Sequence, residues 1–362
     1  MPTHDILVLP GDGIGPEVMQ AALAVLDAAT ENSDLELRLS FDLLHGAAWE
    51  RYGAFCREET VAAALTADAV LAGAVGGPRW DNIRVPGGPE MQDGLMRLRK
   101  ELRAYAGLRP ARAWPGSHSR TPFRPGLAET ADILVLREMC GGVMFALPRG
   151  QETRATGRYA LDTAAYSEGE IRRIAEAGFR LARGRRGRMV SADKANVMES
   201  YRLWRAVVGE VAADYPDVRL THMYADNCAY QMMRRPQDFD VVIGCNLIGD
   251  FLSDLAAVVS GSLGLLPSAC LRGAPHGGPV PGIYEPVHGS APDIAGKGIA
   301  NPIGMILSIA MMLEHSLDAP DIARKIEAAV GQALADGVAT PDLDGTASTS
   351  DMTAAVIERL GA

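Results

Sequence analysis

The stretch Asp240–Leu255, DVVIGCNLIGDFLSDL, joins a short apolar and β-branched run to a helical pattern. Gly244 ends the run, and Gly249 precedes apolar residues at helical spacing. The pattern predicts a buried strand followed by a helix, which is the unit from which α/β proteins are built. Asp250 and Asp254 are four residues apart at the expected start of this helix, so their carboxylates share one face.

Two carboxylates on one helix face repel each other, and two explanations account for them. A helix N-terminus favours acidic side chains by itself, and the spacing alone favours this explanation. A divalent cation offsets the repulsion more strongly, because Mg²⁺ and Mn²⁺ take carboxylate oxygens and fill their remaining positions with water or substrate oxygens. The rest of the chain decides between a solvated helix start and a metal site.

The length of 362 residues predicts two domains or one large α/β unit, and a hydrophobic content of 48% is ample for a core. The net charge of −10 argues against binding to nucleic acid or to a membrane surface. We see no signal peptide before the first predicted strand, and no apolar run approaches the roughly 20 residues of a transmembrane helix.

Cysteine and lysine usage carry two further indications. The five cysteines are odd in number and scattered without a CxxC pair, which suits a reducing cytoplasm and argues against structural zinc. Of 35 basic residues, four are lysine. A lysine in a chain that otherwise uses arginine is expected where the amine has to lose its proton, which arginine does not do. The four lysines are Lys100, Lys194, Lys297 and Lys325.

Strands alternate with helices along the chain, which predicts a largely parallel sheet. The glycine-rich turn at 11–15 follows the first of these strands. Its spacing differs from G-x-G-x-x-G, and Pro16 stands where the third glycine would fall, so we expect a fold other than a Rossmann fold. Strands are expected at 5–10, 35–41, 68–74, 132–137, 188–191, 219–224 and 240–243.

Three further features lie between these elements. Arg99, Arg109 and Arg137 follow or end expected elements, so they form either a carboxylate clamp or three unrelated surface groups. The polar segment 149–169 predicts a loop or a protruding hairpin. The segment 282–304 is long, nearly uncharged and rich in turn residues, and a loop of that length inside a compact domain is usually functional. Helices are expected after it at 305–317 and 320–335, and Ser350 is expected to cap a last helix at 351–360.

Sequence motifs along nearly the whole chain resemble the isocitrate/isopropylmalate dehydrogenase family of decarboxylating β-hydroxyacid dehydrogenases. In the first half they are LPGDGIGPEV at 9–18, GGPRWD at 76–81, LRK at 98–100, LRPA at 108–111 and DILVLRE at 132–138. In the second half they are DKANV at 193–197, NLIGDFLSDLA at 246–256, GSLGLLPSA at 261–269 and EPVHGSAPDIAGKGIANP at 285–302.

The resemblance implies an α/β fold of two domains around a mixed, largely parallel sheet. The cofactor-binding domain would be discontinuous, 1–104 plus 262–362, and 105–261 would form the second domain with the substrate and metal residues. It also implies a homodimer in which the segment near 149–169 is an arm that clasps the partner. The active sites would lie between subunits, so that Lys194 and Asp226 would serve the neighbouring site.

The resemblance also implies the roles of individual residues. Asp250, Asp254 and the neighbouring subunit's copy of Asp226 would hold Mg²⁺ or Mn²⁺, and Lys194 would be the catalytic base beside Asp226. The substrate, a 2-hydroxy diacid, would contact Arg99, Arg109, Arg137, Leu95 and Met96. NAD would be bound by Glu285, His288, Gly289, Ser290, Ala291, Asp293, Ile294 and Asn301.

The implied reaction is the oxidation and decarboxylation of a 3-substituted malate. The metal would bind the 2-hydroxyl and its neighbouring carboxylate and lower the pKa of the hydroxyl. Lys194 would accept that proton directly or through water. Hydride would pass to the nicotinamide, and CO₂ would leave the resulting β-keto acid. Asp293 matches the acid that receives the adenosine ribose, and its charge would repel a 2′-phosphate, which favours NAD over NADP.

Two departures from the family pattern concern the substrate. Met144 occupies the place of the tyrosine that protonates the enolate carbon, and methionine has no proton to donate. Before the LRK motif, either Gln92 or, with a two-residue insertion, Glu90 takes the place of a family glutamate. Met96 is more pliable than the family leucine and would admit a different 3-substituent.

We therefore expect oxidative decarboxylation of 3-isopropylmalate to 2-oxo-4-methylpentanoate with NAD. The alternatives are a paralogue that acts on another 3-substituted malate, on tartrate or on malate, and a catalytically silent paralogue that binds or regulates. The retained acids, Lys194 and arginines weigh against silence, whereas Met144 weighs for it.

Overall fold

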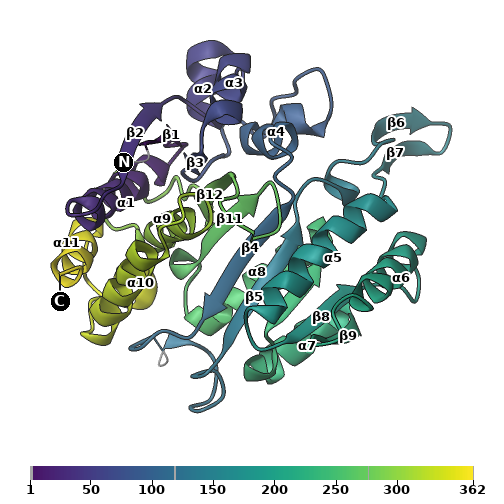
Figure 1. Cartoon of the computed structure of the whole chain (residues 1–362). Coiled ribbons are helices and arrows are strands. Elements are labelled where there is room, and N and C mark those ends of the chain that lie inside the picture. The colour runs from purple at the N-terminus through teal and green to yellow at the C-terminus, as the bar shows by residue number, and fades with distance from the viewer. Residues whose placement is uncertain (1–2, 118–119, 276, 362) are drawn as a thin grey trace.

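The computed structural model describes residues 3–117, 120–275 and 277–361. One mixed sheet of ten strands runs through the molecule in the order β2-β1-β3-β12-β11-β4-β5-β10-β8-β9 (Figure 1). The first five are β2 (Glu36–Phe41), β1 (Thr3–Leu9), β3 (Ala69–Ala72), β12 (Gly282–Pro286) and β11 (Pro267–Leu271). The other five are β4 (Ala106–Arg112), β5 (Asp132–Glu138), β10 (Val241–Gly244), β8 (Arg188–Asp193) and β9 (Arg219–Tyr224).

The outer parts of the sheet are parallel, and the antiparallel pairs gather in the middle. β11 is antiparallel to both of its neighbours, β12 and β4, and β4 is antiparallel to β5. β3 and β10 are buried along their whole length, as expected for apolar runs with helices on both faces. The predicted mixed, largely parallel sheet is therefore confirmed.

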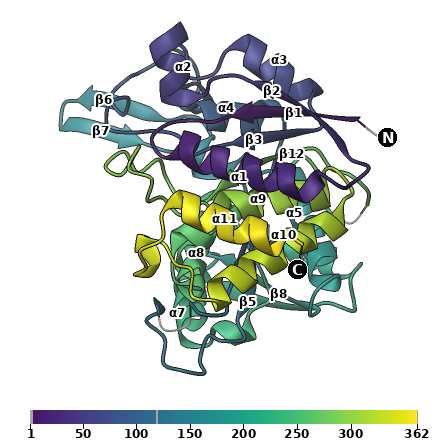
Figure 2. The same cartoon turned by 90° about the vertical axis from the view of Figure 1, so that its left-hand side faces the viewer.

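Helices cover both faces of the sheet (Figures 1 and 2). We call one the α5 face, which carries α1 (Gly15–Thr30), α5 (Glu168–Arg183), α6 (Glu199–Ala212), α9 (Ile303–His315), α10 (Pro320–Ala335) and α11 (Thr349–Arg359). We call the other the α8 face, which carries α3 (Glu58–Thr66), α4 (Gly94–Glu101), α7 (Ala225–Arg234) and α8 (Asn246–Ser260). The short helix α2 (His45–Tyr52) lies beside α3.

The strands divide by their origin in the sequence. The segments 1–104 and 262–362 supply the five strands from β2 to β11, and 105–261 supplies the five from β4 to β9. The predicted boundary between domains therefore falls between β11 and β4, where three residue pairs join the strands. Because one sheet continues across this boundary, the division into two domains stays a prediction.

The polar segment after residue 149 forms a hairpin that projects from the body (Figure 1). Its strands are β6 (Gly150–Arg154) and β7 (Gly157–Leu161), which pair only with each other in the part of the chain that the structure describes. All ten of their residues are exposed. The hairpin alternative is thus confirmed.

Several local predictions were wrong. The expected loop at 282–304 begins with β12, a buried strand, and β11 and β4 were not predicted as strands. All three strands contain proline or glycine, but their positions between other strands outweigh these weak strand formers. The last helix is capped by Ser348, not Ser350, because the Ser348 hydroxyl accepts from the Asp351 amide at 3.1 Å.

The quoted stretch also differs from its prediction. Helix α8 begins at Asn246, one turn before Asp250, with Cys245 at its N-cap. The two carboxylates therefore lie beyond the first turn, where the helix terminus offers them little stabilisation. Other groups have to balance their charge.

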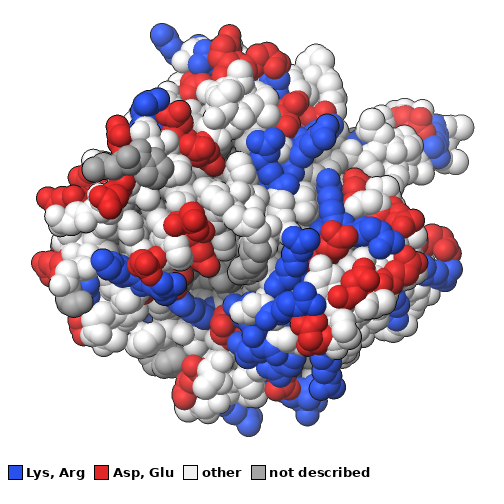
Figure 3. All heavy atoms as spheres, in the orientation of Figure 1, with Lys and Arg blue, Asp and Glu red and all other residues white. Residues whose placement is uncertain are grey.

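Charged side chains of both signs cover the surface. Figure 3 shows basic side chains gathered over the part of the α5 face that residues 105–261 form, with acidic side chains next to them. Several arginines of α5 are in ion pairs, such as Arg172 with Glu210 and Arg183 with Asp217. In the described ranges, no helix is long and apolar enough to cross a membrane.

Candidate active site

Two buried arginines meet one aspartate on the α8 face of the sheet. Arg109 lies in the middle of β4, not at its end, and Arg137 lies near the end of β5. Nη1 of Arg109 is 3.1 Å from Oδ1 of Asp250, and Nη1 of Arg137 donates to the same oxygen. Asp250 is one-third exposed, whereas both arginines are buried. The predicted clamp thus contains two of its three arginines at Asp250.

Asn246 and Ser253 complete the contacts of the two guanidinium groups. Oδ1 of Asn246 accepts from Nε and Nη2 of Arg137 at 3.0 and 2.7 Å. Oγ of Ser253 accepts from Nη1 of Arg109 at 2.8 Å. Burial, followed by the charge of Arg109, lowers the pKa of Arg137 to about 10. An anionic ligand beside the two guanidinium groups would favour their charged forms.

Asp254, the next acid along α8, lies close to another negative charge. Burial, followed by the charge of Asp250, raises the pKa of Asp254. A divalent cation at these two carboxylates would favour the charged form of both. Across the residues that the structure describes, however, no three His, Cys, Asp or Glu side chains come close enough to hold a metal ion. The predicted triad with Asp226 is therefore not assembled within one chain.

Lys194 and Asp226 form a separate pair. Nζ of Lys194, in the loop after β8, donates to Oδ1 of Asp226 in the first turn of α7 at 2.8 Å. The lysine is one-third exposed, and the aspartate is mostly exposed. The hydrogen bond from Lys194 lowers the pKa of Asp226. The two residues predicted to act together do lie together, but on an open surface.

Arg99 leaves the predicted clamp and pairs with Glu285. Its Nη2 donates to Oε1 of Glu285 at the end of β12. Burial alone would lower the pKa of Arg99, but the charge of Glu285 raises it. Leu95 and Met96 are in the first turn of the same helix, whose N-cap is Asp93. The structure thus joins a residue predicted for the substrate to one predicted for the cofactor.

The predicted cofactor loop, 288–301, lies against the glycine-rich turn at 11–15. The amide of Ile14 donates to the carbonyl of Ser290 at 2.8 Å, and a Cβ on Gly13 would come within 2.0 Å of that oxygen. Oγ of Ser290 donates to the carbonyl of Gly76 at 2.8 Å. The close approach explains why this turn needs glycine at position 13.

Within the loop, one polar atom is left without a partner. Nε2 of His288 is buried and makes no hydrogen bond, and burial lowers the pKa of this histidine. Ala291 has a φ of +37°, and the amide of Ile294 donates back to its carbonyl at 3.1 Å. The remaining predicted residues are the exposed Gly289 and Asp293, and Asn301, whose side chain accepts from the Ile303 amide at 3.0 Å.

A cavity of about 960 Å³ opens between α4, the hairpin and the 80–92 loop. Gln92, Met96 and Met144 line it. Glu90 lies elsewhere, paired with Lys100 at 2.8 Å. Of the two alternatives for the family glutamate, the structure therefore places Gln92 at this cavity.

Met144 also touches the arginines. Its Sδ accepts from Nη2 of Arg137 at 3.4 Å, and its carbonyl accepts from Arg149 at 2.7 Å. Thioether sulfur is a weak acceptor, so this contact adds little energy. It does place the methionine next to a group predicted to bind substrate.

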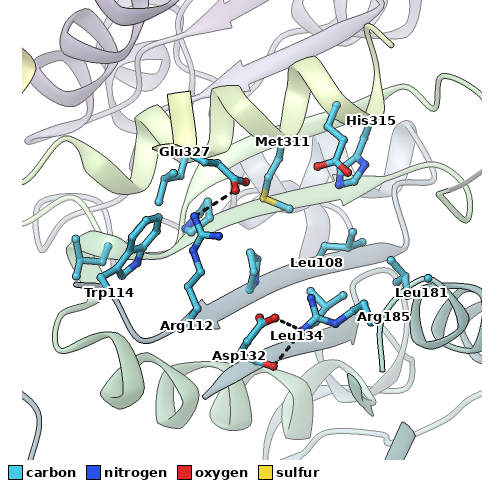
Figure 4. Close-up of a pocket in the computed structure, with 16 residues that line it drawn as sticks. Leu108, Arg112, Trp114, Asp132, Leu134, Leu181, Arg185, Met311, His315 and Glu327 are labelled. Atoms are coloured by element: carbon cyan, nitrogen blue, oxygen red, sulfur yellow. Dashed lines mark hydrogen bonds and ion pairs between the residues drawn. The ribbon is translucent and has the colours of Figure 1, made fainter. Parts of the chain in front are cut away.

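A second cavity, of about 290 Å³, lies on the α5 face between α5, α9 and α10 (Figure 4). Leu108, Arg112 and Leu134 line it from β4 and β5, on the side of these strands opposite Arg109 and Arg137. Arg112 pairs with Glu327 at 3.2 Å, and Arg185 pairs with Asp132 at 2.9 Å. Each of these two arginines thus has an acid of its own, whereas Arg109 and Arg137 share Asp250.

Sequence reasoning missed Asn246 and Ser253. Both are in the quoted stretch, but only the contact of α8 with β4 and β5 shows that they serve the arginines. It also missed Tyr166, whose Oη accepts from the Asn246 amide at 2.9 Å. No spacing rule connects residues this far apart in the chain.

Comparison with known proteins gives the class of this site. The family model described as isocitrate/isopropylmalate dehydrogenase matches residues 5–356. A protein of Xanthomonas euvesicatoria called 3-isopropylmalate dehydrogenase is 50% identical over 342 residues, which cover 94% of each chain. One of the same description from Pseudomonas fluorescens is 49% identical over 348 residues, 96% of this chain and 95% of that one.

Solved structures agree with the sequence matches. A crystal structure of isocitrate dehydrogenase from Methylococcus capsulatus has a TM-score of 0.86 and 34% identity and covers 99% of both chains. A β-decarboxylating dehydrogenase from Thermococcus kodakarensis has a TM-score of 0.78 and 33% identity, covering 99% of this chain and 96% of that one.

These findings define an enzyme of the decarboxylating dehydrogenase class, an oxidoreductase. The chain belongs to the isocitrate/isopropylmalate dehydrogenase family, as the sequence motifs predicted.

The support given to Arg137 is testable. Asn246→Ala would remove two hydrogen bonds from the buried guanidinium of Arg137. A hydrogen bond to a charged group contributes about 1.5–3 kcal/mol to stability. We expect the free energy of unfolding to fall by about that amount, measured by urea titration. Asn32→Ala, at an exposed position, is the control. Equal stability of the two variants would show that Arg137 is satisfied without Asn246.

Proposed function

We propose that the chain catalyses the NAD-dependent oxidative decarboxylation of a 3-substituted malate, with 3-isopropylmalate as the first candidate. The observation that carries the proposal is the meeting of two buried arginines at Asp250, with a second acid one turn further along the same helix. Such a site offers cationic groups to the carboxylates of a diacid and anionic groups to a metal. The names of the relatives support 3-isopropylmalate.

The residues present fit Mg²⁺ or Mn²⁺. Asp250 and Asp254 are four residues apart on one helix, and the raised pKa of Asp254 reports their mutual repulsion after the larger effect of burial. Asp226 of a second subunit would be the third ligand. When bound, the metal would supply charge that favours ionisation of the substrate hydroxyl and of the enolate that follows CO₂ loss.

The residues at 288–301 fit a dinucleotide. Nε2 of His288 is a buried polar atom without a partner, which a ligand would supply. Asp293 is exposed on the same loop, where a carboxylate would accept hydrogen bonds from ribose hydroxyls and repel a 2′-phosphate. The cofactor would supply the hydride acceptor.

The chain's own groups account for binding and proton transfer. Arg109 and Arg137 would hold the substrate carboxylates, and Arg99 would stand between substrate and cofactor through Glu285. Nζ of Lys194 would take the hydroxyl proton, with Asp226 holding the amine in place. Leu95, Met96 and Met144 would surround the 3-substituent.

We also propose a homodimer with shared sites. The segments that carry Lys194 and Asp226 also carry exposed apolar side chains, since Val197 is 66% exposed and Tyr230 57%. On the neighbouring helix α8, Phe251 is 63% exposed. Apolar groups that gather on a surface mark an interaction site. A second copy that covered them would bring Lys194 toward the neighbouring Asp250, and its hairpin would pair with the exposed β6 and β7, since an isolated two-stranded hairpin is marginally stable.

The proposal is tested by NADH formation with 3-isopropylmalate, malate and tartrate in the presence of Mn²⁺. We expect 3-isopropylmalate to be the preferred substrate. NAD should exceed NADP in kcat/KM by about tenfold or more, the effect of one unfavourable contact of about 1.4 kcal/mol. Preference for another diacid would favour the specialised paralogue, and no turnover with any diacid would favour a silent subunit.

Removal of one charged ligand tests the metal site. Asp250→Asn should weaken Mn²⁺ binding and reduce kcat by at least about 10²-fold, because the site loses a carboxylate and two arginines lose their counterion. Asp321→Asn, at an exposed position on α10, is the matched control. Mn²⁺ affinity is followed by calorimetry. Unchanged turnover of the parent enzyme in excess EDTA would exclude the metal.

Restoration of a proton donor tests the role of Met144. If protonation of carbon limits the rate, Met144→Tyr should raise steady turnover, since general acids typically contribute about 10²–10⁴-fold. The parent should then show a burst of NADH followed by slow turnover, and the variant a smaller burst relative to its steady rate. If another donor has replaced the tyrosine, the parent shows no burst, and the variant is slower because tyrosine crowds the site.

A further inference from the structure

His45 has a backbone conformation that side chains rarely adopt. It is the first residue of α2, and its φ is +53°. Histidine is among the residues better tolerated in this left-handed region, but glycine adopts it without strain. Strain of this kind persists where the surroundings fix the residue, and it gathers at functional sites. The contacts of the imidazole show what fixes it.

The imidazole lies between two carboxylates from distant segments. It is 7% exposed. Nδ1 is 3.2 Å from Oδ2 of Asp12, and Nε2 is 3.6 Å from Oδ2 of Asp93. The ring of Phe55 packs at 4.8 Å, and Trp80 meets it edge-on at 6.3 Å. Nδ1 makes no hydrogen bond, and Nε2 lies beyond hydrogen-bond distance of Asp93, so this side chain links the two acids through close electrostatic contact.

Asp12 is the acid that connects His45 to the predicted cofactor loop. It belongs to the turn at 11–15, whose Ile14 amide donates to Ser290 of that loop. Its carboxylate accepts from the amides of Gly46, Ala47 and Gly76 at 3.0, 2.7 and 2.8 Å. A shift of the loop against this turn would therefore act on Asp12 and on the start of α2.

Asp93 is the acid that connects His45 to the predicted substrate helix, α4. Its Oδ1 accepts from the amides of Leu95 and Met96, each at 2.8 Å, and so caps α4. The other oxygen, Oδ2, faces His45. The same helix carries Arg99, and His45, Asp93 and Met96 all line the 960 Å³ cavity.

We propose that His45 is a positioning residue that couples the dinucleotide loop to the substrate helix, so that each ligand binds more tightly in the presence of the other. The linkage runs from Ser290 through Asp12, His45 and Asp93 to the first turn of α4. This inference rests on the proposed function, since it takes 288–301 as the cofactor loop and α4 as a substrate element.

The test compares NADH affinity with and without 3-isopropylmalate plus Mn²⁺, followed by NADH fluorescence in the intact enzyme. The ratio of the two Kd values measures the coupling, and ratios of about 5–150 are typical of coupled sites. In the parent we expect a ratio in this range. In His45→Gly it should fall to near one, while folding is retained because glycine accepts the φ of +53°.

Two further variants separate coupling from general effects. Asp93→Asn keeps the helix cap, since asparagine caps as well as aspartate, but removes the charge that faces His45. It should lose the same coupling, and the double variant should lose no more. Asp318→Gly is the matched control, because Asp318 is exposed between α9 and α10 and has a φ of +51°. Its ratio should equal that of the parent.

Three results would overturn the inference: a parent ratio of one, a parent-like ratio in His45→Gly, or additive losses from His45→Gly and Asp93→Asn. Failure of the proposed function gives a different result. In that case the parent would bind NADH or 3-isopropylmalate with no measurable affinity in either order.

Discussion

The burial of two guanidinium groups against one carboxylate constrains the whole site. An arginine without a partner in the interior is strongly destabilising, so Arg109 and Arg137 require Asp250 and Asn246. The balance is incomplete, since two cations share one acid. The same oxygen, Oδ1 of Asp250, receives both arginines, and it is also the natural ligand of a cation. In the proposed function, a metal at Asp250 would draw this carboxylate away from the arginines, and the substrate carboxylates would take its place. Binding of metal and of diacid would thus favour each other.

The antiparallel middle of the sheet places these groups. Strand β4 runs against both β11 and β5, and its alternate side chains point to opposite faces. Arg109 therefore faces α8, while Leu108 and Arg112 face the cavity on the α5 face. The same strand also joins the two segments of the chain that the sequence assigned to different domains. A change in the angle between them would act on both cavities at once.

Sequence reasoning found the elements whose pattern is local. The β-branched run at 240–243 is strand β10, and the polar segment after 149 is a hairpin. It failed where neighbours decide: β11 and β12 contain turn-forming residues but are buried between other strands. It also misplaced the start of α8, since Cys245 is not a residue that commonly caps a helix.

The sequence predicted which residues belong to the site, but not which residues contact one another. Motifs marked the three arginines and the acids, and the structure shows two arginines at Asp250 and the third at Glu285. Pairs such as Arg137 with Asn246 depend on how β5 meets α8 across 109 residues of sequence, and spacing rules reach only a few residues. Lys194 and Asp226 pair with each other and not with Asp250. In the proposed homodimer a second subunit would bring them to the site, and residue spacing within one chain does not show such an interface.

In the proposed function, Met144 would separate ligand binding from proton delivery. The charged groups are retained, and in the proposed function they would govern diacid binding, hydroxyl ionisation and hydride transfer. Methionine fills a space comparable to other large side chains, so the packing around Arg137 survives. What it lacks is a proton, which is needed only after CO₂ has left. A change at this position therefore leaves the early steps to the retained groups and alters the last one. Met144 also lines the 960 Å³ cavity together with Met96 and Gln92, where the 3-substituent would lie in the proposed function.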